Sequence, residues 1–251
     1  MKVLVLAAGF ATRLRPLTDK TPKPLLDVAG KTILDRMLDD LEATDAIDEI
    51  LLVTNQAHYA AFLAWRERGT RKHSIPIQVV SDGATNNQTR LGAVRDLAFA
   101  VEHWNLVGPL LVVAGDNLFD FRFESFLEDH TAKPRSLVLA YQEDNPQKLG
   151  RAGVARLDSA GRILELVEKP STPQGRWICP PVYLFESIAL AELPTFLANA
   201  PDTDAPGNFI AWLASRKLVW AHRMQGARFD VGNLENYHAA PAWLASRRSK
   251  L

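Results

Sequence analysis

Small and basic residues are concentrated in the segment LAAGFATRLRPLTDKTPKPLL, which runs from Leu6 to Leu26. Small residues at a strand end let an anion approach backbone N–H groups, and an arginine can bind two phosphate oxygens at once. Lys23 lies between two prolines, which fix the backbone that carries its ammonium group. A solvated basic loop is the alternative interpretation. The candidate phosphate-binding residues are Ala7, Ala8, Gly9, Ala11, Thr12, Arg13 and Lys23.

Carboxylates follow strand-like runs elsewhere in the chain. Asp116 comes after the apolar run Leu110–Ala114, and Asp230 belongs to the segment RFDVGN. In open α/β sheets, ligands bind at the carboxyl ends of strands, and carboxylates beside phosphates can hold a hard cation such as magnesium. Each aspartate could instead end a turn or cap a helix. Glu168 and Lys169 add a carboxylate and an ammonium group at another strand end, where an exposed pair leaving a hairpin is the alternative.

Short apolar runs alternate with helical patterns in the first half of the chain, which is typical of a doubly wound α/β sheet. The second half is richer in strands, and Asp158–Gly161 has the composition of a hairpin turn. The predicted strands are Lys2–Ala7, Glu49–Thr54, Ile75–Ser81, Leu110–Ala114, Ser136–Gln142, Gly153–Leu157, Ile163–Glu168, Leu218–Met224 and, interrupted by Pro180-Pro181, Trp177–Phe185. The predicted helices are Thr32–Ala43, His58–Arg68, Leu91–Trp104, Ile188–Asn199, Phe209–Ser215 and Leu234–Ser246.

These elements predict the fold class and the domain organisation. We expect an α/β fold with a Rossmann-like, mixed, mainly parallel sheet flanked by helices. We expect a single domain over residues 1–251 with two lobes.

The composition is that of an ordinary globular protein and excludes several classes. The 251 residues are 47% hydrophobic and 23% charged, and the formal net charge is +0, so no global field favours nucleic acid or an anionic membrane. The single cysteine, Cys179, excludes an internal disulfide and a cysteine-rich zinc site. No apolar stretch approaches the ~18 residues of a membrane span, and the start MKVLVLAAG fits a first strand better than a signal peptide. We expect a cytoplasmic protein that binds neither nucleic acid nor membrane.

Several segments resemble, in the right order, those of one family over essentially the whole chain. LAAGFATRLRPLTDKTPKPLL resembles the glycine-rich signature of the sugar-phosphate nucleotidylyltransferases, also called nucleoside-diphosphate-sugar pyrophosphorylases. VVAGDN resembles their first metal-binding aspartate, LGRAGVARLD and LVEKP their sugar-binding and lysine segments, and RFDVGNLENY their second metal site. The resemblance implies a nucleotide-diphospho-sugar transferase-like fold, with a nucleotide-binding lobe at about 1–120 and an acceptor-binding lobe at about 121–251. It also implies that an NTP and a sugar 1-phosphate give an NDP-sugar and pyrophosphate, with magnesium as cofactor.

The resemblance also implies a role for each nucleotide-binding residue. Arg13 would bind the triphosphate, and Lys23 would contact phosphate near the reacting centre. Asp116 and Asp230 would hold Mg²⁺. The sugar phosphate is already an anionic nucleophile, so positioning and charge neutralisation suffice and no general base is needed.

On the acceptor side, the resemblance implies contacts with the sugar phosphate. Lys169 would hold its phosphate, while Glu168 and the backbone of Gly153 would meet sugar hydroxyls. Pro180-Pro181 replaces the polar-plus-glycine pair that is usual in the family and offers no hydrogen-bond donor. If this strand lines the pocket, buried hydroxyls would lack partners, and we predict that glucose 1-phosphate is a poor acceptor.

Two further departures concern the nucleotide side. The family usually has glycine where Ala11 stands, and because alanine disfavours positive φ we predict a negative φ at this residue. The segment SDGATNNQTRLGAV shares only LGA with the family's base-reading segment. Gly92 is therefore the candidate base contact, and Asn86 and Asn87 could bind a base or simply shape the loop.

Three other functions compete with sugar nucleotidylyl transfer. The same fold could act as a cytidylyltransferase on phosphocholine, for which Trp177 and Tyr183 could form an aromatic cage or pack in the core. Retention of the charged site residues disfavours a silent regulatory subunit that binds nucleotide-sugars. A nicotinamide-dependent dehydrogenase would need G-x-G-x-x-G, whereas residues 9–14 read GFATRL. We expect an NTP and a sugar 1-phosphate, or another small phosphate acceptor, as partners. A homo-oligomer is compatible with the sequence.

Overall fold

The computed structural model describes residues 1–68, 74–200 and 202–248, which fold into two units built from interleaved stretches of chain. Unit 1 comprises Met1–Leu4, Leu91–Val113 and Glu124–Gln225. Unit 2 comprises Val5–Arg90, Ala114–Phe123 and Gly226–Leu251. The sequence leads us to expect a contiguous nucleotide-binding lobe followed by an acceptor-binding lobe. That division concerns function and stays a prediction.

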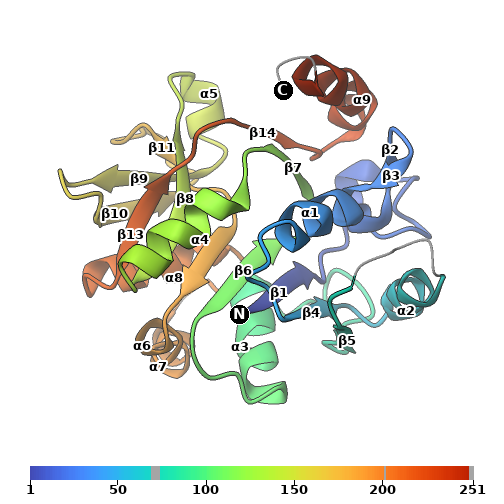
Figure 1. Ribbon diagram of the computed structural model, residues 1–251, viewed down its shortest axis with the longest axis horizontal. Helices are drawn as coiled ribbons and strands as arrows, with labels where there is room; N and C mark the ends of the chain where they lie inside the picture. The colour runs from blue at the N-terminus through green and yellow to red at the C-terminus, as the bar shows by residue number, and fades with distance from the viewer. Residues whose placement is uncertain (69–73, 201, 249–251) are drawn as a thin grey trace. The chain divides into compact units, whose positions relative to one another are not determined.

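Unit 2 is built around the neighbouring strands β1, β4 and β5, with β4 and β5 parallel. Two antiparallel pairs, β2 with β3 and β7 with β14, accompany them (Figure 1). The elements of this unit are β1 (Lys2–Ala7, from Val5 on), the 3-10 helices η1 (Thr12–Leu14) and η2 (Lys23–Leu25), β2 (Asp27–Val28), β3 (Lys31–Thr32), α1 (Ile33–Glu42), β4 (Glu49–Thr54), α2 (Tyr59–Glu67), β5 (Ile77–Ser81), β7 (Asn117–Asp120), β14 (Ala227–Asp230) and α9 (Leu234–Arg248).

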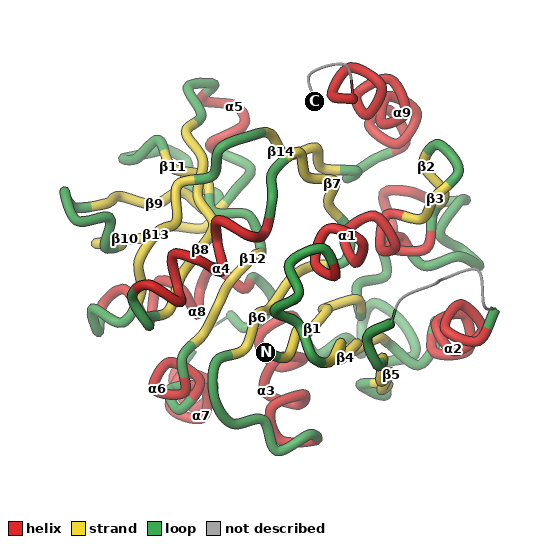
Figure 2. The backbone as a smooth tube through the Cα atoms, in the orientation of Figure 1, coloured by secondary structure: helices red, strands yellow, loops and turns green. Residues whose placement is uncertain are grey.

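Unit 1 contains strands in the order β10-β9-β11-β8-β12-β6, with β13 parallel to β8 and the other pairs antiparallel. Turns, green in Figure 2, join β9 to β10 and β10 to β11. The elements of this unit are α3 (Ala93–His103), β6 (Leu110–Ala114), α4 (Phe123–Ala132), β8 (Ser136–Gln142), α5 (Pro146–Leu149), β9 (Gly153–Leu157), β10 (Ile163–Glu168), β11 (Trp177–Ile178), β12 (Val182–Phe185), α6 (Ser187–Leu190), α7 (Leu193–Asn199), α8 (Pro206–Ser215) and β13 (Val219–Arg223).

Local sequence signals account for the element boundaries that the sequence predicted. Thr32 caps α1, since its hydroxyl oxygen accepts a hydrogen bond of 3.0 Å from the Asp35 N–H. The β9–β10 turn closes with a 3.1 Å hydrogen bond from the Gly161 N–H to the Asp158 carbonyl, and Gly161 has a φ of +80° that glycine tolerates. Pro180-Pro181 separates β11 from β12, as expected for residues without a backbone N–H.

One predicted helix is wrong as a single element. The stretch Ile188–Asn199 contains two helices, α6 and α7, with Pro194 in the first turn of α7. Proline lacks the N–H that a continuous helix requires at that point but suits a first turn, so the chain ends one helix and starts another. The sequence analysis also did not predict β7 or α4.

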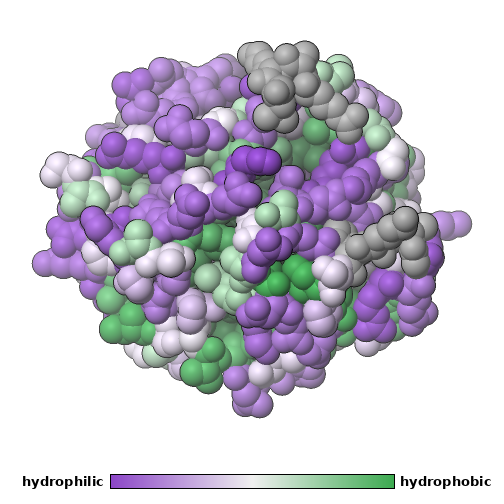
Figure 3. All heavy atoms as spheres, viewed as in Figure 1, coloured by the Kyte–Doolittle hydropathy of each residue, from purple (hydrophilic) through white to green (hydrophobic). Residues whose placement is uncertain are grey.

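Large apolar side chains are seldom exposed in the part of the chain that the structure describes. Hydrophilic side chains predominate on the face shown in Figure 3. Among the described residues, the large apolar side chains that are exposed are Val107, Leu164, Val167 and Ile188. No helix in the described part of the chain combines the length and the apolar character that crossing a membrane would require.

Candidate functional site

The loop that follows β1 is held by hydrogen bonds to its carbonyl groups. Thr54 and Asn55 are buried at the end of β4, where Thr54 donates to the Ala7 carbonyl at 3.4 Å and Asn55 donates to the Ala8 carbonyl at 2.9 Å. Ala7 and Ala8 are 4% and 5% exposed, so side chains larger than a methyl group would not fit without rearrangement. These hydrogen bonds and the close packing fix the backbone at Ala7 and Ala8.

Ala11 adopts a left-handed conformation, with φ 45° and ψ 43°. The predicted negative φ is wrong. The Ala11 carbonyl accepts hydrogen bonds from the Leu14 N–H and from the hydroxyl of the buried Thr18, both at 3.0 Å. These two bonds and the immediate start of η1 demand a tight turn, so alanine occupies a region of φ and ψ that costs an L-residue about 1–2 kcal/mol. Such strain is often kept at functional sites.

Lys23 is a nearly buried lysine, with its side chain 10% exposed. It begins η2 between Pro22 and Pro24, and the turn closes with hydrogen bonds from the Leu25 N–H to the Pro22 carbonyl and from the Leu26 N–H to the Lys23 carbonyl. A buried ammonium group requires an anionic partner. Lys23 Nζ donates to Asp116 Oδ2 at 2.8 Å and lies 3.7 Å from Asp230 Oδ1.

The structure thus brings Lys23, Asp116 and Asp230 together in unit 2, and we call these three residues the charged cluster. Asp116 follows β6, and Asp230 ends β14. Gly115 lets the chain pass close to its neighbours, because a Cβ there would lie 3.1 Å from Val5 Cγ1 and 3.3 Å from Pro24 Cγ. Burial opposes ionisation of Asp116, but the Lys23 ammonium and the Arg228 guanidinium outweigh it and hold the pKa of Asp116 below its usual value.

The charged cluster has the donor set of a partial site for a hard cation. Asp116 and Asp230 offer carboxylate oxygens, the ligands that Mg²⁺ prefers, and their side chains are 38% and 47% exposed. Within the described residues, no group of three or more His, Cys, Asp or Glu side chains forms a complete metal site. Two carboxylates fit the way in which Mg²⁺ is usually bound beside a nucleotide, where phosphate oxygens and water complete the shell.

A cavity of about 360 Å³ lies beside the loop in unit 2. Phe10 and Thr12 line one part of it, and His58, Asn86 and Asn87 line another. Burial lowers the pKa of His58, which keeps this ring neutral, and the ring lies 5.9 Å from that of Phe10. The cavity is therefore lined by aromatic and neutral polar groups together with the charged pair Arg15 and Asp19.

Asn86 and Asn87, for which the sequence left base binding and loop shaping open, have partners in their own loop. Asn86 Oδ1 accepts from the N–H groups of Gln88 and Thr89, at 2.9 and 3.2 Å, which favours the loop-shaping role. Asn87 Oδ1 accepts from Arg90 at 2.9 Å. Their contact with a nucleobase stays a prediction.

Gly92 belongs to unit 1, where it precedes α3 with φ +92°. A Cβ there would lie 2.9 Å from the Thr203 carbonyl oxygen and from Asp204 Cα, so close packing already requires glycine. The N–H groups of Ala93 and Val94 bind the carbonyls of Asp204 and Thr203. This packing does not test whether Gly92 contacts the base, so that contact stays a prediction.

Arg13 and Thr12 lie in η1 with exposed side chains. Leu14, the residue after Arg13, is 1% exposed and packs in the core cluster that includes Leu26, Ile33 and Leu118. This packing anchors the short helix, so the Arg13 guanidinium starts from a fixed backbone. Its contact with triphosphate stays a prediction.

Glu168 ends β10 in unit 1, directly opposite Gly153 of β9. Its carboxylate accepts a hydrogen bond from the Gly207 N–H at the start of α8, and a Cβ on Gly207 would lie only 1.8 Å from Oε1. A Cβ on Gly153 would lie 3.1 Å from the same oxygen. Burial raises the pKa of Glu168, although the Lys169 charge and the Gly207 hydrogen bond oppose the shift. Two glycines therefore make the space for this carboxylate.

Lys169 follows with an unusual backbone. Its φ of 45° is left-handed, and its N–H binds the Ala152 carbonyl at 3.0 Å. Cys179 lies on the other side of Gly153, since its N–H binds the Gly153 carbonyl at 2.9 Å. Burial raises the pKa of the Cys179 thiol, and the Glu168 charge adds to the rise, so the thiol stays neutral. Pro180, the next residue, is buried.

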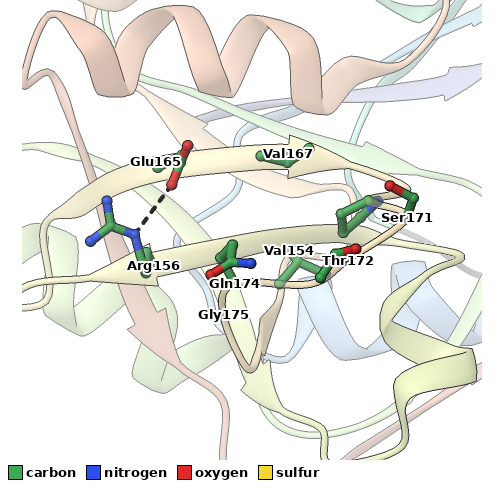
Figure 4. Close-up of a pocket in the computed structure, with 9 residues that line it drawn as sticks. Val154, Arg156, Glu165, Val167, Ser171, Thr172, Gln174 and Gly175 are labelled. Atoms are coloured by element: carbon green, nitrogen blue, oxygen red, sulfur yellow. Dashed lines mark hydrogen bonds and ion pairs between the residues drawn. The ribbon is translucent and has the colours of Figure 1, made fainter.

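A second cavity in unit 1, of about 180 Å³, lies on the opposite face of the β9–β10 hairpin (Figure 4). Val154 and Arg156 line it from β9, and Glu165 and Val167 line it from β10. Side chains alternate between the faces of a strand, so Gly153 and Glu168 lie on the other face. The Arg156 guanidinium pairs with Glu165 at 3.2 Å, and both side chains are about half exposed.

The aromatic-cage candidates are engaged elsewhere in unit 1. Tyr183 is 3% exposed and its ring lies 5.7 Å from that of Phe185, as expected for a core residue. The Arg223 guanidinium lies 5.3 Å from the centre of the Trp177 ring. These contacts favour the packing roles over a cage for a quaternary ammonium group.

Comparison with known proteins decides the family. The profile of the family described as nucleotidyl transferase matches residues 2–247, nearly the whole chain. The protein is a member of the nucleotidyl transferase family. The charged cluster and Glu168 are thus parts of a nucleotidyl transferase, and the resemblance seen in the sequence motifs is confirmed.

Individual relatives agree with this family. The chain is 27% identical over 252 residues to the mannose-1-phosphate guanylyltransferase catalytic subunit beta of Dictyostelium discoideum, covering 100% of this chain and 66% of that protein. The chain spans about 50–66% of the length of the curated relatives that it matches first. Two structures of a UDP-glucose pyrophosphorylase, one apo and one with UDP-glucose, superpose with TM-scores of 0.82 at 18% identity, covering 98% of this chain and 98–99% of theirs. They confirm the predicted fold class of this nucleotidyl transferase.

Two residues linked to the charged cluster by hydrogen bonds were not named from the sequence. Asn117 donates from Nδ2 to Asp116 Oδ1 at 2.6 Å, and Arg228 donates from Nε to Asn117 Oδ1 at 2.7 Å. A signal did exist: Arg228 and Asp230 are two residues apart on a strand and so share a face. The missing information was the pairing of β14 with β7, which sets Asp230 opposite Asn117.

Proposed function

We propose that this nucleotidyl transferase moves a nucleoside monophosphate from an NTP to a sugar 1-phosphate and releases pyrophosphate. One observation carries the proposal: Lys23, 8% exposed, is fixed between the carboxylates of Asp116 and Asp230 beside a strand-end loop of small residues. Such an arrangement suits polyphosphate and a hard cation. The relatives named as mannose-1-phosphate guanylyltransferase and UDP-glucose pyrophosphorylase support it.

The chemistry requires charge neutralisation more than proton transfer. An oxygen of the sugar phosphate attacks the α-phosphorus of the NTP, a new P–O bond forms, and the bond to the β-phosphate oxygen breaks as pyrophosphate leaves. The attacking oxygen is already anionic, so no base is needed. We assign Lys23 and Arg13 to the phosphates, where cations placed in advance stabilise charge that develops in the transition state.

Mg²⁺ is the cofactor that we assign to the charged cluster. Asp116 and Asp230 would hold it together with phosphate oxygens. A bound Mg²⁺ neutralises charge on the transferring and leaving phosphates. The lowered pKa of Asp116 supports the assignment, because this carboxylate stays ionised and able to bind a cation in mildly acidic solution.

For the acceptor we assign Glu168, Gly153 and Lys169 in unit 1. Glu168 keeps one oxygen on the Gly207 N–H, and a carboxylate held in this way can accept from a sugar hydroxyl. Lys169 supplies an ammonium group for the sugar phosphate. The formal net charge of +0 supports small-molecule partners over nucleic acid or an anionic membrane. A cytoplasmic location is part of the same proposal.

The test is a matrix of nucleoside triphosphates against sugar 1-phosphates and phosphocholine, with Mg²⁺ present and pyrophosphate release as readout. GTP with mannose 1-phosphate, dTTP or UTP with glucose 1-phosphate, and CTP with phosphocholine form its first rows. Pyrophosphate release that requires a sugar 1-phosphate supports the proposal. Release that occurs only with phosphocholine, or in no combination, would reject it.

A further inference from the structure

Five side chains in unit 2 form a closed ring of contacts that includes both carboxylates of the proposed cation site. Lys23 contacts both aspartates, as described above. Asp116 uses its second oxygen, Oδ1, for Asn117, which in turn accepts from Arg228. Arg228 Nη2 lies 3.8 Å from Asp230 Oδ1, which completes the ring.

The ring is tight on one side and loose on the other. The three contacts around Asp116 and Asn117 measure 2.8, 2.6 and 2.7 Å, whereas the two contacts of Asp230 measure 3.7 and 3.8 Å. Asn117 is 3% exposed and the Arg228 side chain 17%, so water competes little for these bonds. Both oxygens of Asp116 are thus engaged before any ligand binds, which fixes the orientation of its carboxylate.

We propose that Asn117 and Arg228 are positioning residues that orient Asp116 for cation binding, with Arg228 acting through Asn117. The inference rests on the proposed function, because that function supplies the cation. Residues that hold a metal-binding side chain typically affect metal affinity by about 10–100-fold when they are replaced. Neither residue needs to touch substrate or metal for this effect.

A purely structural role for the pair is the competing explanation. In that case, Asn117 and Arg228 would only join β7 to β14. The antiparallel ladder already pairs four residues of each strand, from Ala227 opposite Asp120 to Asp230 opposite Asn117. The strands therefore have backbone contacts of their own, and the side-chain bonds are available for positioning.

The first pair of variants separates hydrogen bonding from charge. Arg228→Met removes both the hydrogen bond to Asn117 and the positive charge, whereas Arg228→Gln removes the charge but retains an amide donor. Loss of a nearby positive charge alone would strengthen cation binding in both variants. Loss of positioning would weaken it only in Arg228→Met.

The measurement is Mn²⁺ affinity, followed by EPR of the free ion, with a non-hydrolysable α,β-methylene NTP and no turnover. We expect about tenfold weaker binding in Arg228→Met, equivalent to roughly 1.4 kcal/mol, and binding within about threefold of the wild type in Arg228→Gln. Asn117→Leu should weaken binding about as much as Arg228→Met. The double variant should bind Mn²⁺ no more weakly than either single variant, because both substitutions break the same chain of hydrogen bonds to Asp116.

The matched control is Arg247→Met. It removes an arginine that pairs at 3.4 Å with Asp120, which lies on β7 together with Asn117. It should leave Mn²⁺ affinity unchanged. Equal or tighter Mn²⁺ binding in Arg228→Met, or a wild-type protein that binds no Mn²⁺, would overturn the inference. If Asn117→Leu does not fold, the Arg228 pair carries the test. Because the readout needs no turnover, it stays separate from pyrophosphate release, on which the proposed function depends.

Discussion

The charged cluster of unit 2 and the Glu168 site of unit 1 hold their carboxylates in different ways. Asp116 is held by side chains, namely Lys23 and Asn117, and nearby positive charge lowers its pKa. Glu168 is enclosed by the backbone of two glycines, Gly153 and Gly207, and burial raises its pKa. Side-chain charge prepares the first carboxylate to stay ionised, whereas backbone shape determines the position of the second.

This difference predicts different sensitivities. Removal of a charge should damage the charged cluster most, because its members compensate one another. Addition of a methyl group should damage the Glu168 site most, because its space depends on missing Cβ atoms.

The largest effect is expected in the charged cluster. Asp116→Asn and Asp230→Asn should each lower turnover at least ~100-fold, the usual scale for the loss of a key electrostatic group. Steady-state kinetics and a thermal melt of each variant check this, with Asp120→Asn on β7 as the control expected to retain turnover. Near-normal turnover of either variant at moderate Mg²⁺ would remove that aspartate from the cation site.

In unit 1, Gly207→Ala should displace the Glu168 carboxylate. The new Cβ would lie 1.8 Å from Oε1, so the flexible side chain must move and lose its hydrogen bond to residue 207. We expect the KM for the sugar 1-phosphate to rise about tenfold, or roughly 1.4 kcal/mol, while the KM for the NTP changes little. A larger effect on the NTP than on the acceptor would contradict the assignment of Glu168.

A control for the added methyl group is Gly150→Ala, where the nearest atoms are 3.5 Å away and φ is −65°. This variant should fold with an unchanged Tm. It shows whether an extra Cβ in unit 1 matters by itself or only beside Glu168.

Glu168→Gln should change stability in a pH-dependent way. Because the folded protein raises the pKa of Glu168 above 4.5, the folded state binds the proton more tightly than the unfolded state. The free energy of unfolding of the wild type therefore falls as the pH rises through the folded pKa of Glu168. Glutamine does not ionise, so the variant does not show this decrease. The variant should melt at a higher temperature than the wild type at pH 8, with the difference disappearing near pH 4. A difference of the same size at both pH values would show that burial of the charge is not the cause.

The smallest effect concerns backbone strain in the loop that follows β1. Ala11→Gly should relieve about 1–2 kcal/mol of left-handed strain and lose about 0.5–1 kcal/mol to the greater freedom of the unfolded chain. Denaturant unfolding should show a net gain of about 0.5–1 kcal/mol. Ala29→Gly, at a second left-handed alanine with φ 53°, should give a similar gain without any effect on turnover. A lower free energy of unfolding in both variants would contradict the presence of backbone strain at these two alanines.

The sequence predicted the regular elements better than the irregular ones. Lys2–Ala7, Glu49–Thr54 and Gly153–Leu157 form strands with the predicted bounds, because their apolar pattern and flanking turns are local signals. The helix over 188–199 was wrong because Pro194 can start a helix as well as interrupt one. The left-handed Ala11 was wrong because tertiary hydrogen bonds, including the one from Thr18, outweigh the preference of the residue.

The same distinction between local signals and tertiary contacts applies to the residues of the candidate site. Lys23, Asp116 and Asp230 were recognisable because charged residues at strand ends are a local pattern, and the structure brings all three together. Asn117 and Arg228 were not recognised because their role depends on the register between two strands that are distant in sequence. The requirement for glycine at Gly207 was not recognised for a similar reason, because the absence of a Cβ matters only where α8 packs against β10.

The most direct test of nucleotidylyl transfer follows the oxygen atoms. A sugar 1-phosphate labelled with ¹⁸O at its non-bridging phosphate oxygens is incubated with enzyme, Mg²⁺ and the preferred NTP, and the products are read by ³¹P NMR. Attack by the sugar phosphate on the α-phosphorus predicts that all label stays in the NDP-sugar, with one ¹⁸O bridging its two phosphorus atoms, and that pyrophosphate is unlabelled. Label in the released pyrophosphate, or orthophosphate without an NDP-sugar, would contradict the account.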